Sequence, residues 1–166
     1  MKQLSHHTHK SLKAKRTFQI FAEQLKSPYN VGSLFRLADA LGIQKIYFGG
    51  DTPLPPNRKV TKTSRSTEKY VLFEQRTNAN KLITELKANK HIVIALELCD
   101  QSVPLNTISL EKNRPICLIL GDEKMGVSQD SLEAADLVIH IPMLGENSSM
   151  NVIQACSIAA YTLINQ

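Results

Sequence analysis

Three short runs in the second half of this 166-residue chain are apolar along most of their length. They lie within residues 91–98, Ile116–Leu120 and residues 137–141. A strand in a parallel sheet is covered on both faces and therefore reads as a continuous apolar run instead of an alternating one. Segments with helical spacing separate the runs. The sequence thus predicts an α/β fold with a mostly parallel sheet flanked by helices.

The first half of the chain shows the same alternation of strands and helices. Asn30 is suited to cap a helix that Gly42 ends, and residues 51–66, with three prolines, are expected to form a long loop. The last helix is expected to be apolar nearly all round and hence largely buried. We predict strands at residues 17–23, 45–48 and 70–73, and helices at residues 79–89, 131–135 and 150–164.

The apolar runs at residues 116–120 and 137–141 each end in a turn that carries glycine, proline or an acid. In open α/β sheets, turns at the carboxyl ends of strands are where small ligands bind. A polar Ser149-Met150-Asn151 follows at the start of the last predicted helix. The sequence therefore predicts a small-ligand site in the C-terminal third of the chain.

Several familiar site motifs are absent from the sequence. Gly121 and Gly126 have the spacing of P-loop glycines, but Val127-Ser128 follows them where a phosphate-binding lysine is needed. Gly49-Gly50 lacks the last glycine of a dinucleotide fingerprint. Without Cys-x-x-Cys, His-x-x-x-His or Gly-x-Ser-x-Gly, we expect no metal, redox or serine-hydrolase site. The three cysteines are expected to be buried reduced thiols, namely Cys99, Cys117 and Cys156.

The net charge of +5 is unevenly distributed. Residues 1–16 hold five basic residues and no acid, and a second basic stretch around residues 58–69 contains only one acid. Such clusters suit nucleic-acid phosphates, because Lys and Arg release condensed counterions. A solvated tail and a soluble surface loop are the alternative, which composition alone slightly favours. The candidate residues for contacts with nucleic-acid phosphates are Lys13, Lys15, Arg16, Arg58, Lys59, Lys62 and Arg65.

Length and hydropathy indicate one domain at residues 17–166, preceded by a basic arm at residues 1–16. No apolar stretch approaches the roughly 18 residues of a membrane span, and the polar N-terminus is unlike a secretory signal. We therefore expect a cytoplasmic protein with no membrane partner.

Three blocks of residues carry a family resemblance. Residues 30–42 read N-x-G-S-x-x-R-x-A-x-A-x-G, and residues 120–128 read L-G-D-E-K-x-G-V-S. Residues 141–145 read I-P-M-x-G and are followed by S-M-N-V at residues 149–152. In this order and spacing the blocks closely resemble the SpoU (TrmH-like) family of RNA ribose 2′-O-methyltransferases, over nearly the whole chain.

The resemblance implies a SPOUT fold with a C-terminal trefoil knot, which the periodicity does not predict. It also implies a homodimer, and S-adenosylmethionine as the cofactor bound in the knot loops. By the family pattern, the residues that hold the cofactor are Leu96, Gly121, Ile141, Pro142, Met143, Gly145 and Met150.

The same resemblance assigns catalytic roles to Arg36, Asn30, Glu123, Ser149 and Asn151. Arg36 would lie near the ribose 2′-hydroxyl and the neighbouring phosphate, and in the family it can come from the partner subunit. A guanidinium is a poor base in water, so whether Arg36 takes the proton itself is open. The structural alternatives are a surface charge for Arg36 and helix caps for the others.

The implied activity is that of an RNA (ribose-2′-O-)-methyltransferase, with tRNA favoured over rRNA because the chain is short and its C-terminal blocks resemble the tRNA guanosine enzymes. The alternatives are a non-catalytic RNA-binding homologue and a base-nitrogen methyltransferase of a related knotted family. Ser64-Arg65-Ser66 replaces the small, glycine-containing turn of many relatives, which leaves the RNA-facing loop open.

Overall fold

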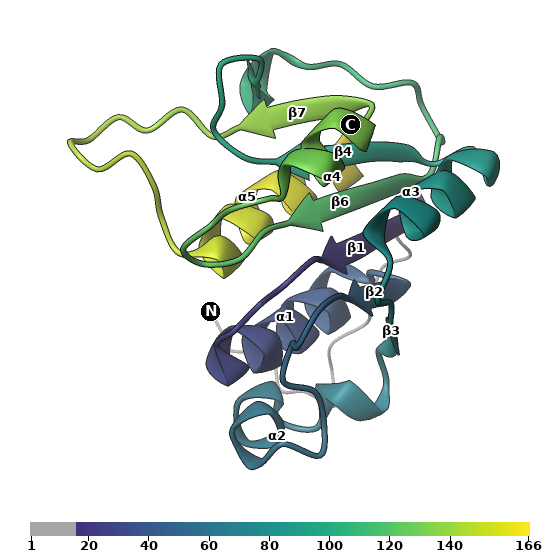
Figure 1. Ribbon diagram of the computed structural model, residues 1–166, viewed down its shortest axis with the longest axis vertical. Helices are drawn as coiled ribbons and strands as arrows, with labels where there is room; N and C mark the ends of the chain where they lie inside the picture. Colours follow the sequence, from purple (N-terminus) through teal and green to yellow (C-terminus); the bar gives the residue numbers. More distant parts are fainter. Residues whose placement is uncertain (1–15) are drawn as a thin grey trace, which may run out of the picture.

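A computed structural model describes residues 16–166, so Lys13 and Lys15 lie outside the described part of the chain. Seven strands form one sheet in the order β3-β2-β1-β6-β4-β7-β5, and every neighbouring pair is parallel (Figure 1). The predicted α/β fold with a parallel sheet is confirmed. The strands are β1 (Phe18–Ala22), β2 (Lys45–Phe48), β3 (Leu72–Gln75), β4 (Ile92–Leu96), β5 (Val103–Pro104), β6 (Ile116–Leu120) and β7 (Leu137–His140).

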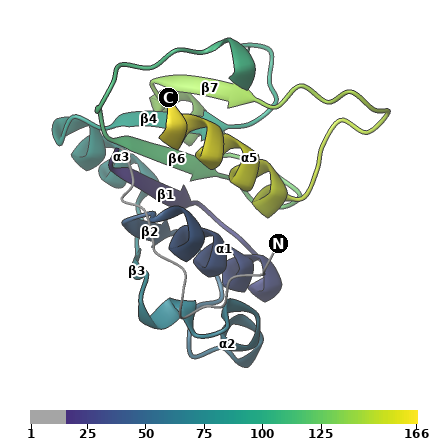
Figure 2. The same ribbon diagram turned by 180° about the vertical axis from the view of Figure 1, so that it is seen from behind.

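Helices cover both faces of the sheet, which explains why the central strands β4 and β6 are apolar at every position. One face packs against α1 and α5, and the other against α3 and α4 (Figures 1 and 2). In β1, Phe18 and Ile20 belong to the first core and Phe21 to the second. The helices are α1 (Pro28–Leu41), α2 (Arg58–Ser64), α3 (Ala79–Ala88), α4 (Gln129–Ala134) and α5 (Val152–Asn165), with 3-10 turns at Thr67–Lys69 and Leu105–Thr107.

The N-terminal cap of helix α1 lies three residues before the predicted cap, Asn30. The cap is Ser27, whose Oγ accepts a hydrogen bond from Asn30 N at 3.4 Å, and Pro28 occupies the first turn. Proline is favoured there because its missing N–H has no helical partner to lose. The prediction that Asn30 caps the helix is therefore wrong, and the Asn30 side chain is free for another contact. Gly42 ends the helix as predicted, in a left-handed conformation with φ 64°.

The proline-rich segment at residues 51–66 is only partly a loop, because α2 forms within it. Asn57 caps α2 by accepting from Lys59 N and Val60 N. Val60 and Ser64, one turn apart, are its two buried residues. Two inward positions are too few for the apolar periodicity to show in the sequence.

Helix α5 is buried on one side only, which corrects the expectation that this helix, apolar nearly all round, is largely buried. Ile158 is 43% and Tyr161 63% exposed on its outer side. Among the cysteines, Cys117 and Cys156 are buried and Cys99 is half-buried, and all three are free thiols. Within residues 16–166 no helix has the length and apolar character needed to cross a membrane.

Gly32 is the point where α1 and α2 touch. A Cβ at this position would lie 2.6 Å from Thr63 Cβ and 2.7 Å from the Val60 carbonyl oxygen. Gly32→Ala should therefore push the two helices apart and lower the free energy of unfolding by about 1–3 kcal/mol, measured by urea denaturation. The exposed change Ala40→Ser on the same helix serves as control and should cost less than about 1 kcal/mol. Equal stability of Gly32→Ala and the native protein would contradict this close contact.

Candidate active site

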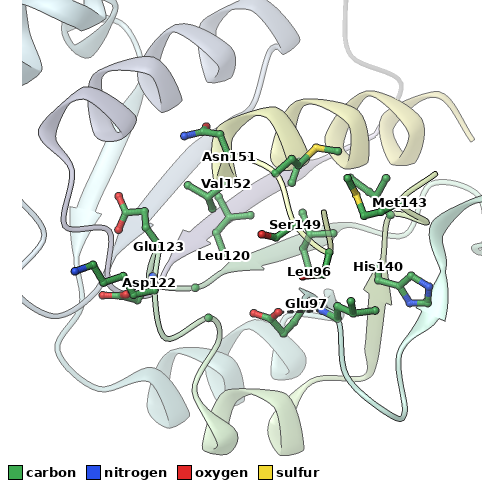
Figure 3. Close-up of a pocket in the computed structure, with 18 residues that line it drawn as sticks. Leu96, Glu97, Leu120, Asp122, Glu123, His140, Met143, Ser149, Asn151 and Val152 are labelled. Carbon is green, nitrogen blue, oxygen red and sulfur yellow. Dashed lines mark hydrogen bonds between the residues drawn. The ribbon is translucent and has the colours of Figure 1, made fainter. Parts of the chain in front are cut away.

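A cavity of about 390 Å³ lies at the carboxyl ends of β4, β6 and β7 (Figure 3). These strands are neighbours in the sheet, so the segments that follow them converge at one edge. The segment that leads into α5 closes the other side, where Ser149 and Asn151 line the cavity. The predicted small-ligand site thus coincides with a hollow of the structure.

Most of the residues predicted to hold a cofactor line this cavity. Pro142 and Gly145 do not line it, and both are exposed in the segment between β7 and α5. A Cβ added at Gly145 would have no neighbour within 4 Å, so nothing in the described chain requires glycine there. The lining residues among those predicted are Leu96, Gly121, Ile141, Met143 and Met150.

The turn after β6 folds back on itself tightly. Asp122 and Gly126 exchange two backbone hydrogen bonds of 3.0 Å. A Cβ at Gly121 would lie 2.0 Å from the Gly126 carbonyl carbon, so only glycine fits. Backbone N–H groups of Lys124 and Met125 donate to Asp122 Oδ1 and lower the pKa of that carboxyl. The turn therefore presents an ionised carboxylate at the cavity.

Glu123 joins this turn to the start of α1. Its carboxylate accepts hydrogen bonds from Lys26 N at 2.8 Å, Ser27 N at 2.9 Å and Asn30 Nδ2 at 2.8 Å. Partial burial opposes ionisation, but the N–H groups of Lys26, Asn30 and Ser27 outweigh it, so the pKa of Glu123 lies below its ordinary value. The carboxylate is therefore charged at neutral pH.

Asn30 extends this contact to the last helix. Asn151 Nδ2 donates to Asn30 Oδ1 at 3.2 Å, and Asn151 Oδ1 accepts from Ile153 N at 2.9 Å as the cap of α5. The result is a polar chain, Asn151–Asn30–Glu123, which connects three segments that are far apart in the sequence. Figure 3 shows Glu123 and Asn151 on the same side of the cavity. The structure thus brings together four predicted residues, Asn30, Glu123, Ser149 and Asn151.

Arg36 is not part of this arrangement. It is exposed on α1 and does not line the cavity. Six residues of helix place it about 9 Å beyond Asn30 along the axis. It forms no hydrogen bond or ion pair with another residue of the described chain. In the structure of this single chain, the predicted arginine is therefore separate from the other predicted catalytic residues.

Five predicted RNA contacts fall within the described residues, and one of them is placed differently from expectation. Arg16 is only 6% exposed, and its Nη2 donates to the backbone carbonyl of Glu111 at 3.3 Å. Its side chain packs inward and is not presented to a phosphate, which corrects that prediction. The four exposed residues lie on α2 and at its end: Arg58, Lys59, Lys62 and Arg65.

Two acidic residues near the cavity did not emerge from the sequence. Glu23 accepts hydrogen bonds from Ser128 N at 3.0 Å and Ser131 Oγ at 2.8 Å, which holds the start of α4. Glu97 lines the cavity and accepts from Val127 N at 3.0 Å. Each directly follows the buried strand β1 or β4. The sequence signal that could have identified Glu23 and Glu97 is an acidic residue at the carboxyl end of an apolar run.

A family model described as the SpoU rRNA Methylase family matches residues 17–161. The chain belongs to this family. The match covers the sheet, the cavity and the Asn151–Asn30–Glu123 chain, so the resemblance in the three sequence blocks is confirmed. The predicted trefoil knot stays a prediction.

SpoU relatives of known activity and structure agree with this membership. The tRNA (guanosine(18)-2′-O)-methyltransferase of Escherichia coli K12 is 30% identical over 139 residues, which are 84% of this chain and 59% of that protein. The crystal structure of the A. aeolicus TrmH/SpoU tRNA modifying enzyme superposes with a TM-score of 0.80 at 28% identity, covering 92% of this chain and 77% of that one. An AdoMet-bound rRNA methyltransferase from Sinorhizobium meliloti gives a TM-score of 0.80 at 25% identity, covering 90% and 56%.

The chain spans little more than half the length of the Escherichia coli relative it matches. Among residues 16–166, no group of three or more His, Cys, Asp or Glu side chains is placed to hold a metal ion.

Glu123→Gln should weaken the native fold at neutral pH, because an amide cannot accept all three N–H groups as well as a carboxylate does. The pKa of Glu123 is lowered in the folded protein, so its stabilising effect is present above the ordinary value of 4.5 and is lost as the pH falls through the lowered one. The melting-temperature gap between native protein and variant should therefore shrink below about pH 4.5.

The matched control for this measurement is Glu133→Gln. Glu133 is exposed on α4, and the one hydrogen bond it accepts within the described chain comes from Gln129 Nε2. This variant should melt close to the native protein at every pH. A Glu123→Gln gap that stayed constant from neutral pH to about pH 3 would show that the carboxylate charge contributes nothing.

Proposed function

We propose that this SpoU-family chain is an S-adenosylmethionine-dependent RNA methyltransferase that methylates a ribose 2′-hydroxyl. The observation that carries the proposal is the Asn151–Asn30–Glu123 chain beside the cavity, because it unites the three sequence blocks in one polar site. The names of the relatives support it, since the Escherichia coli protein is a tRNA 2′-O-methyltransferase and the Sinorhizobium meliloti structure is bound to AdoMet.

The cavity has the size and lining that S-adenosylmethionine requires. Its volume of about 390 Å³ lies at the lower end of the roughly 300–1,000 Å³ of small-molecule sites. Leu96, Ile141 and Met143 offer apolar surface for an adenine ring, while the carboxylates of Asp122 and Glu123 suit a cationic ligand. When bound, the cofactor supplies an electrophilic methyl group on a positively charged sulfur.

The polar chain acts by positioning. Glu123 accepts a hydrogen bond from the side-chain amide N–H of Asn30. The Asn30 oxygen therefore faces Asn151 and accepts a hydrogen bond from the side-chain amide of Asn151. Both amides are thereby held in one orientation at the cavity edge, where a ribose hydroxyl can be aligned. Alignment of reacting groups supplies much of the rate in such transfers. A site of this kind needs no nucleophilic side chain, in agreement with the absence of a hydrolase motif.

A homodimer accounts for the position of Arg36. Arg36 is remote from the cavity of its own subunit, and the outer side of α5 leaves Ile158 and Tyr161 exposed. We infer that two copies pair so that Arg36 of one subunit reaches the cavity of the other, where its charge stabilises the ribose–phosphate group.

Transfer RNA is the favoured substrate and ribosomal RNA the second candidate. The Escherichia coli relative acts on tRNA, and the structural neighbour from Sinorhizobium meliloti is an rRNA methyltransferase. Helix α2 contacts α1 at Gly32, close to Asn30, so its basic side chains lie beside the proposed site. We assign the phosphate contacts to Arg58, Lys59, Lys62 and Arg65, and place the protein in the cytoplasm with its RNA.

Arg36→Ala should lower methyl transfer to undermethylated tRNA by about 100-fold or more, while S-adenosylmethionine binding, followed by calorimetry, stays near the native value. The same holds for Asn30→Ala, which removes the centre of the polar chain. Native protein that released no heat with S-adenosylmethionine would overturn the enzyme proposal.

Mixing these two inactive variants tests the shared site. If Arg36 serves the partner's cavity, mixed dimers contain one intact site, and an equal mixture should recover about a quarter of native activity. If each site were built within one subunit, both subunits of every mixed dimer would be defective and no activity would return. The readout is the transfer of labelled methyl groups after the subunits have been allowed to exchange.

Removing charge from α2 should flatten the salt dependence of RNA binding. Each phosphate contact contributes about 0.7–0.9 to the slope of log K against log salt, so Arg58→Gln with Lys62→Gln should reduce it by roughly 1.5. Lys112→Gln, on the exposed segment before β6, is the matched control and should leave the slope unchanged. A truncation lacking residues 1–15 tests the basic arm by the same slope. An unchanged slope in the double variant would remove α2 from the RNA surface.

A further inference from the structure

Glu97 is a carboxylate on the cavity wall that the three family blocks do not include. It follows β4 directly and lines the cavity on the side opposite α5 (Figure 3). Within residues 16–166 it forms no ion pair. Its charge is therefore not matched by a cation of the described chain.

Two backbone N–H groups hold this carboxylate in place. Oε2 accepts from Val127 N at 3.0 Å, and Oε1 accepts from Leu98 N at 2.9 Å. A Cβ at Gly126 would lie 2.3 Å from Oε2, so the side chain packs directly against that glycine. A carboxylate can accept about four hydrogen bonds. Each oxygen of Glu97 thus keeps a free position while its orientation is already set.

The location of Glu97 matches one part of the proposed cofactor. Leu98, on one side of it, belongs to the wall with Ile141 and Met143 that suits an adenine ring. Val127, on the other side, follows the turn that carries Asp122 and Glu123, where the reacting end must lie. The ribose of S-adenosylmethionine connects these two ends of the molecule and carries two adjacent hydroxyls.

We propose that Glu97 binds the ribose of the cofactor, with its two carboxylate oxygens accepting the 2′- and 3′-hydroxyl protons. This inference rests on the proposed function, because it takes S-adenosylmethionine as the ligand of the cavity. Two acceptors on one planar group match two neighbouring donors, and hydrogen bonds to a charged acceptor are stronger than neutral ones. Glu97 then selects a ribonucleoside ligand over its deoxy forms.

Calorimetric titration tests this with S-adenosylhomocysteine and its 2′-deoxy and 3′-deoxy analogues as probes. Native protein should bind each analogue on the order of 10- to 100-fold more weakly than the parent compound. In Glu97→Gln, affinity for the parent compound should fall by more than affinity for either analogue, because the parent loses both hydroxyl contacts and each analogue has only one to lose. The discrimination between parent and analogues should therefore be smaller in the variant.

A merely structural role for Glu97 gives a different result. If Glu97 only held the Val127 turn, Glu97→Gln would weaken all three ligands equally, and this outcome overturns the proposal. Equal affinity of the native protein for all three ligands also overturns the proposal. This comparison uses only the native protein, so it can be made even if Glu97→Gln fails to fold. Glu133→Gln is the matched control and should keep the native discrimination. Native protein that binds none of the compounds would instead refute the proposed function itself.

Discussion

The site depends on the place of β6 in the sheet, between β1 and β4. Parallel pairing on both sides sets the turn after β6 between the segments that follow β1 and β4. On one side Glu123 reaches the start of α1, and on the other Val127 N binds Glu97. Because the ladder fixes this register, a shift of β6 would break the polar chain and the cavity wall together.

Around this edge of the sheet, acidic side chains connect segments that are distant in the sequence by hydrogen bonds. Glu23, Glu97 and Glu123 each accept backbone N–H groups from a segment distant in the sequence. A carboxylate suits this task because it accepts several N–H groups and gains from the charge-assisted bond. Two of these acids, Glu97 and Glu123, line the cavity together with Asp122, and their negative charge complements a sulfonium cofactor. The same carboxylates therefore stabilise the loops and favour binding of the proposed ligand.

Local signals carried much of the prediction. The ends of β2 and β6 and the Gly42 stop of α1 follow from apolar runs and turn residues within a few positions. Helix α2 was not predicted from the sequence, because its two buried positions make no periodic pattern. Asn30 was taken for a cap because it precedes the apolar stripe, yet Ser27 performs that task and Asn30 turns to Glu123. The competing partner lies 93 positions away in the chain, beyond any local pattern.

The fold class, the family and the residue types of the site could be predicted from the sequence, because these depend on local periodicity and on motif order. Which of these residues contact one another became clear from the three-dimensional structure. It joined Asn30, Glu123 and Asn151, turned Arg16 inward, and left Arg36 outside the cavity. These outcomes depend on strand order and helix packing, which bring distant segments within hydrogen-bond range, and no single stretch of sequence encodes them.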